Sequence, residues 1–132
     1  MPDVSWIAIL LCGVATLLIG AMWYSPLLFA RAWQRETGLS DDTLRSGSAP
    51  LRFGLTFVLS LVAASVFALF IGNAMTVGQA TIAGAAAGST WVAASFGINY
   101  LFEHRSLKLW LINGGYHVIQ FTAFGAIIGA LQ

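Results

Sequence analysis

Charged side chains are missing from three long runs of this sequence. Residues 4–30, 53–102 and 109–132 contain no Asp, Glu, Lys or Arg, and together they cover 101 of the 132 positions. Only 8% of the chain is charged, whereas about 25% is usual in soluble domains. A soluble domain of this length needs a polar surface around its core. The pattern therefore predicts an integral membrane protein.

The lengths of the runs indicate how often the chain crosses the bilayer. A spanning helix needs about 20 apolar residues, so the first and last runs each hold one span, at about residues 4–24 and 107–131. As one helix the middle run would be about 75 Å long, so it must turn back. Gly and Asn cluster at residues 72–78, which predicts spans at about 51–71 and 79–101. We expect an all-α four-helix bundle that forms one domain over residues 1–132.

The positions of the Lys and Arg residues predict the orientation of the helices in the membrane. They fall in two of the three loops: Arg31, Arg35, Arg45, Arg52, Arg105 and Lys108. Cytoplasmic loops collect Lys and Arg, so both termini are expected outside. A signal peptide is the rival interpretation of the first span, but Asp3 stands where a cation is typical and the apolar stretch is too long.

Residues 27–37 predict a short helix between the first two spans, starting at Ser25-Pro26 and ending at Gly38. Its two sides differ in polarity: Phe29, Ala30 and Trp33 against Arg31, Gln34 and Arg35. It is either an amphipathic helix on the inner membrane surface or a solvated connector. Tyr24 and Tyr100 are expected in the aromatic belt at the same interface.

Small residues predict where the helices touch, because helices in lipid associate by close packing. One stripe of the third span has Ala80, Gly84, Gly88 and Ser95, and the other small residues are Gly125 and Gly129 in the fourth span and Gly13, Thr16 and Gly20 in the first. These faces close the four-helix unit or join copies of it. Because four helices leave little interior for a pathway, we expect a homo-oligomer.

The fourth span is the most polar, and its candidate intramembrane site is Asn113, Tyr116, His117 and Gln120. His117 lies nine residues beyond Lys108, about 13 Å deep and close to the bilayer midplane. Ionisable groups at that depth are candidate functional residues, and their N–H groups need partners. His117 is therefore either a structural link between helices or a ligand or proton carrier.

A second candidate site lies at the inner end of the third span: Asn99, Glu103, His104 and Arg105. Glu103 and Arg105 are two residues apart, so they would meet only if the chain bends between them. Each can instead pair across the loops. The pattern favours a solvated rim with structural ion pairs over a binding site.

Two stretches resemble a family of small bacterial membrane proteins catalogued as domain of unknown function 1761. They read WYSPLLFARAW at residues 23–33 and FEHRS at residues 102–106 followed by INGGYH at 112–117. The resemblance covers essentially the whole chain and implies a four-span protein of the bacterial inner membrane, without an activity. It also implies signature positions: Trp23, Tyr24, Pro26, Phe29, Trp33, Glu103, Arg105 and Tyr116.

Several chemistries are not supported by the residues. Six Lys and Arg against five Asp and Glu leave no basic surface for nucleic acid, and Cys12 alone forms no disulfide or dithiol redox pair. No metal motif or nucleophile–base spacing occurs. A haem bound by His104 and His117 of one chain has poor geometry, because one lies at the rim and the other near the midplane. We therefore expect no enzyme, cofactor or metal.

Two functions stay open. The first is a non-catalytic membrane module, either a homo-oligomer or an accessory subunit of another membrane protein, with the lipid bilayer as its surroundings. The alternative is a small oligomeric transporter or channel lined by Asn113, His117 and Gln120. Small multidrug-resistance exporters use a carboxylate in the first helix, and residues 4–30 have none. Proton exchange at a histidine remains open, because histidine titrates near neutral pH.

Overall fold

The computed structural model describes residues 3–132, and this part of the chain contains helices and no strands. The elements are α1 (Trp6–Trp23), α2 (Ala30–Thr37), α3 (Asp41–Arg45), α4 (Ala49–Ile71), α5 (Val77–Ala87), η1 (Gly88–Ala93), α6 (Ala94–Phe102) and α7 (Leu107–Leu131). Elements α5, η1 and α6 form one continuous stretch, Val77–Phe102. With α1, α4 and α7 it gives four helices long and apolar enough to cross a membrane. The predicted all-α four-helix bundle is confirmed, and the chain is a multi-pass membrane protein.

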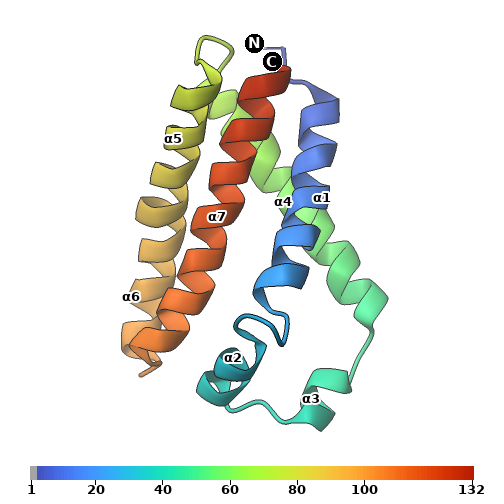
Figure 1. Cartoon of the computed structure of the whole chain (residues 1–132), viewed down its shortest axis with the longest axis vertical. Coiled ribbons are helices and arrows are strands. Elements are labelled where there is room, and N and C mark those ends of the chain that lie inside the picture. The colour runs from blue at the N-terminus through green and yellow to red at the C-terminus, as the bar shows by residue number, and fades with distance from the viewer. Residues whose placement is uncertain (1–2) are drawn as a thin grey trace.

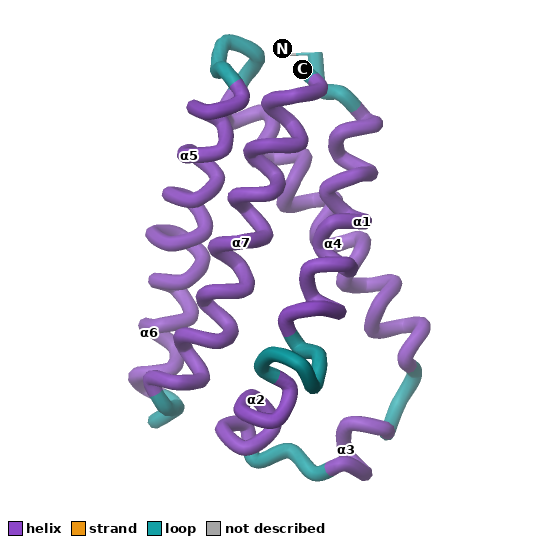
Figure 2. Tube along the Cα trace, viewed as in Figure 1, coloured by secondary structure: helices purple, strands orange, loops and turns teal. Residues whose placement is uncertain are grey.

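Helix α7 is the central element of the bundle. It packs along α5, η1 and α6 on one side and against α1 on the other (Figure 1). Helix α4 crosses α1 and then diverges from it towards the end of the molecule where α2 and α3 lie. The loops of the α2–α3 connection and the α6–α7 turn share this end, and the chain termini lie at the other (Figure 2). The bundle therefore has one end that carries the basic loops and one that does not.

Hydroxyl side chains set where the long helices begin. At each start the side chain accepts a hydrogen bond from a backbone N–H, as an N-cap does: Ser5, Ser48, Thr76 and Ser106. As a result α4 and α5 each begin two residues earlier than predicted. Helix α4 ends at Ile71 and α5 begins at Val77, which confirms the predicted turn.

The predicted start of the short helix after α1 is wrong. Residues 24–29 form turns, and α2 begins at Ala30. The Phe29 N–H bonds back to the Trp23 carbonyl at 3.1 Å, and the two rings lie 4.7 Å apart. These contacts fold the segment back on α1 before a helical turn can form. Gly38 ends α2 as predicted, with φ +72.

Glycines allow α5, η1 and α7 to approach until backbone meets backbone. A Cβ atom on Gly84 would collide with the Phe121 carbonyl, and one on Gly125 would collide with the Ala80 carbonyl. The predicted small-residue stripes therefore close the four-helix unit itself. In the first span Gly13 faces α4, where a Cβ would meet Leu61 at 2.9 Å.

The sequence predicts that the small-residue stripe of the third span continues to Ser95. In the structure it does not. Element η1 is a π-helix, which holds one residue more per turn than an α-helix. This shifts the buried face from Gly88 to Ala93 and then to Gly97, which faces the Trp110 ring. Ser95 is exposed, and its hydroxyl donates to the Trp91 carbonyl at 2.6 Å.

Candidate functional site

The polar side chains of α7 meet groups from α1 and α6 deep inside the bundle. The predicted intramembrane site residues share one face of α7: Asn113, Tyr116, His117 and Gln120. Tyr116 and Gln120 are buried, and Asn113 and His117 are half-buried. The face carries two sets of hydrogen bonds, one near the middle of the bundle and one closer to the end with the basic loops.

Thr16 of α1 is the centre of the first set. The Gln120 amide donates to the Thr16 hydroxyl at 3.0 Å, and that hydroxyl donates to the Cys12 carbonyl at 3.0 Å. The Tyr116 hydroxyl donates to the Thr16 carbonyl, also at 3.0 Å. Thr16 was predicted only as a packing residue. Its polar role depends on which residues α7 places opposite, so spacing along α1 carries no signal for it.

The same set fixes the proton of His117. Because the Gln120 NH₂ group faces Thr16, its oxygen faces His117 and lies 2.7 Å from Nδ1. An amide oxygen only accepts, so Nδ1 carries the ring proton and Nε2 carries a lone pair. Nε2 has no hydrogen-bond partner among residues 3–132. The imidazole stacks on Phe96 of α6, with ring centroids 5.2 Å apart and planes at 17°.

Asn113 is the centre of the second set. Its side-chain oxygen accepts from the Tyr24 hydroxyl at 2.7 Å, and its NH₂ group donates to the Tyr100 hydroxyl at 2.7 Å. One amide thus joins the end of α1, α7 and α6. Tyr24 and Tyr100 were predicted as belt residues, and no pattern in the sequence indicated their link to Asn113.

Most signature positions implied by the resemblance gather next to Asn113. The Trp23 indole N–H donates to the Ile112 carbonyl at 2.9 Å. Tyr24 contacts Tyr116 at 5.4 Å between ring centroids and Trp33 at 5.9 Å. With Phe29 packed on Trp23, this aromatic cluster fixes the α1–α2 segment against α7. Pro26 lies exposed in the turn and takes no part in the cluster.

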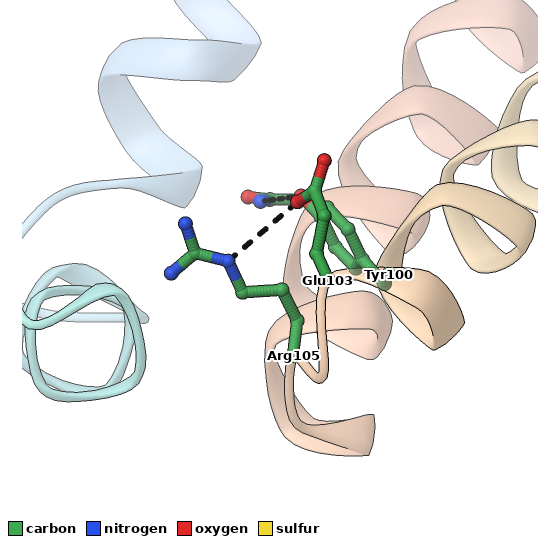
Figure 3. Close-up of polar contacts among 4 residues, drawn as sticks. Tyr100, Glu103 and Arg105 are labelled. Carbon is green, nitrogen blue, oxygen red and sulfur yellow. Dashed lines mark hydrogen bonds and ion pairs between the residues drawn. The ribbon is translucent and has the colours of Figure 1, made fainter.

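The rim residues are exposed and lie in the last turn of α6 (Asn99) and in the α6–α7 turn (Glu103, His104 and Arg105). His104 has φ +56, a left-handed conformation that bends the chain after α6. The bend brings Arg105 Nε to 3.7 Å from Glu103 Oε2, which was one of the two arrangements left open (Figure 3). Their side chains are 43% and 55% exposed, so the pair contributes only about 0.2–1 kcal/mol.

Neither cluster has the composition of a metal site. Within residues 3–132, no three His, Cys, Asp or Glu side chains lie together in a way that could bind a metal ion. The intramembrane cluster can instead form hydrogen bonds between helices. The rim cluster presents one exposed ion pair to its surroundings.

Comparison with known proteins identifies a family and no activity. No curated protein and no solved structure matches the chain significantly. A family described as "Protein of unknown function (DUF1761)" matches residues 7–129, which include nearly all of the four long helices, the aromatic cluster and the rim. The chain therefore belongs to the DUF1761 family.

Proposed function

We propose that this protein is a non-catalytic membrane module that works as a homo-oligomer or as an accessory subunit of another membrane protein. The observation that carries the proposal is the pairing of polar groups inside the bundle. Among the described residues, no buried side-chain nitrogen or oxygen lacks a hydrogen-bond partner. Asn113 and Gln120 both use the two ends of their amides within the chain.

This pairing supports a structural role because an unpaired polar group in hydrocarbon costs several kcal/mol. A catalytic or transporting group must instead leave part of its hydrogen-bonding capacity to a substrate. Here the bonds join α1, α6 and α7, and those of Asn113 lie beside the aromatic cluster. The network therefore holds this part of the bundle in one arrangement for a partner to recognise.

The proposed location is the bacterial inner membrane, with both termini outside. The two basic loops lie at one end of the bundle and the termini at the other (Figure 1). The preference of Lys and Arg for the cytoplasmic side supports this orientation. A reporter domain that is active only outside the cytoplasm should be active when it is fused at Asn73 and when it is fused after Gln132. A cytoplasmic signal from either site contradicts the orientation.

A transporter or channel lined by Asn113, His117 and Gln120 has one observation in its favour. The ring nitrogen Nε2 of His117 has no partner in the described part of the chain, so it can accept a proton. The other two side chains are occupied by α1 and α6. Transport through them would first break bonds that hold the helices together.

Substitution of His117 separates the two functions. In His117→Gln the side chain can still pair with Gln120 but no longer titrates. In His117→Leu the pairing is lost too. We expect His117→Gln to restore the phenotype of a deletion strain fully and to keep wild-type accumulation in the membrane. Loss of function in His117→Gln at normal accumulation would establish the proton pathway instead.

Ile119→Leu is the matched control, because Ile119 is an exposed side chain of the same helix.

The assembly itself is tested by light scattering of the protein purified in mild detergent, together with identification of co-purifying membrane proteins after cross-linking. A monomer without any cross-linked copy or partner contradicts the module.

A further inference from the structure

The first half of α4 stands apart from the rest of the bundle. Residues 49–59 are exposed, except for Phe57, which is half-buried. All buried residues of α4 come from its second half, from Ser60 to Ile71. Gly54 has no atom within 4 Å of the position of a Cβ, and α4 first meets α1 one turn later, where Phe57 lies against Gly13. The divergence leaves a wedge between α1, α4 and α7.

The wedge contains a cavity of about 410 Å³, within the usual range of about 300–1,000 Å³ for ligand pockets. Its lining includes Thr16 and Ala21 of α1, Tyr24 just after α1, Phe53 and Thr56 of α4, and Tyr116 of α7. Thr16 and Tyr24 are eight residues apart, so the cavity extends about 12 Å along the helix. It therefore reaches from the middle of the bundle to the end with the basic loops.

The hydroxyl groups around the cavity have already donated their protons to the protein. Tyr24 donates to the Asn113 side chain, and Tyr116 donates to the Thr16 carbonyl. Thr56 donates to the Arg52 carbonyl at 2.8 Å. Backbone carbonyl oxygens only accept, so the directions at Tyr116 and Thr56 are fixed. The hydroxyl oxygens keep lone pairs, and the lining includes no charged side chain.

We propose that this wedge binds an amphiphile whose polar group donates hydrogen bonds, a long-chain alcohol or a protonated amine, taken from the bilayer. The oxygens of Tyr24, Thr56 and Tyr116 accept its O–H or N–H. The rings of Phe53 and the two tyrosines contact its apolar body. Carbonyl, carboxylate and phosphate groups find no free hydroxyl proton among these three residues. This inference goes beyond the proposed module and does not depend on it.

Four probes of equal chain length test the recognition in the full chain, reconstituted in phospholipid nanodiscs. A photoreactive dodecanol labels the protein, and 1-dodecanol, dodecylamine, dodecyltrimethylammonium and methyl dodecanoate compete with it. We expect label on peptides of α1 and α4. We also expect 1-dodecanol, dodecylamine or both to compete with the label. The stronger competitor identifies whether the wedge prefers an alcohol or a protonated amine. Equal competition by the ester or by the trimethylammonium compound overturns the proposal, since neither donates a hydrogen bond.

Two variants test whether the ligand binds in this cavity. Ala21→Leu fills the cavity and should reduce labelling at least tenfold. Thr56→Val removes one acceptor from an exposed position and should weaken binding about three- to tenfold. Ala130→Leu is the matched control, because Ala130 is exposed and lies outside the cavity. Unchanged labelling in Ala21→Leu overturns the proposal. Absence of labelling in the wild-type protein, because a second copy of the chain occupies the wedge, also overturns it.

Discussion

The two sides of α7 differ in how completely they are packed. On the side of α5 and η1, glycines bring backbone against backbone, and no space remains for even a methyl group at Gly84 or Gly125. On the side of α4, half a helix is exposed and a cavity remains open. The loosely packed side has the more apolar helix, since α4 is more hydrophobic than the stretch Val77–Phe102 on the tightly packed side. The difference shows that hydrophobicity places helices in the membrane, whereas small residues decide which of them close on each other.

Substituting one glycine on each side should give the largest contrast. Gly84→Ala places a methyl group on the Phe121 carbonyl and should lower the free energy of unfolding by about 3 kcal/mol. Gly54→Ala meets open space and should raise it by about 0.5–1 kcal/mol, because alanine favours the helix. Unfolding in mixed micelles, followed by circular dichroism, measures both. Similar effects at the two positions would mean that the α4 side is packed as tightly as the other.

Two asparagines test whether the polar network holds the helices on the α6 side. Asn113→Leu leaves the hydroxyls of Tyr24 and Tyr100 without their partner, so it should destabilise the bundle by about 1–3 kcal/mol. Asn99→Leu changes an exposed residue of α6 and should cost less than about 0.5 kcal/mol. The same unfolding measurement compares them, and a double-mutant cycle of Asn113→Leu with Tyr100→Phe should show coupling. Additive effects in that cycle contradict the bond.

The π-helix should tolerate the loss of one residue. Deleting Thr90, which is exposed, turns η1 into an α-helix while both flanking segments keep their contacts with α7. We expect accumulation in the membrane within about twofold of wild type. Deleting the exposed Ile119 from α7 rotates the following residues by about 100° and should abolish accumulation. Western blots of membrane fractions give the comparison, and equal loss in both deletions would show that the extra residue is needed.

The rim ion pair should show the smallest effect. Glu103→Gln removes the partner of Arg105 at a position where both side chains are about half exposed, so the free energy of unfolding should change by less than about 1 kcal/mol. The change should shrink further in 0.5 M salt. A larger effect that persists in salt would indicate that Glu103 has a second, buried partner.

The sequence predicted the features that depend on local pattern. The spans follow from apolar runs, and the turn between α4 and α5 follows from Gly and Asn. Features that depend on rotation about the helix axes were missed or wrong. The start of α2 depends on Phe29 packing on Trp23, and the register around Ser95 depends on the π-helix. Asn113 and Tyr24 are 89 residues apart, so no spacing rule links them.

The fixed direction of the bonds around Gln120 has a consequence for selectivity. Its amide leaves His117 with a bare lone pair on Nε2, and the tyrosines beside it have likewise given their protons to the backbone or to Asn113. At Tyr24, Tyr116 and His117, the hydrogen-bond donors are therefore used within the protein, and the lone pairs remain. In the proposed wedge site, a head group that brings only lone pairs would therefore be repelled, whereas one that brings an O–H or N–H donor would be bound.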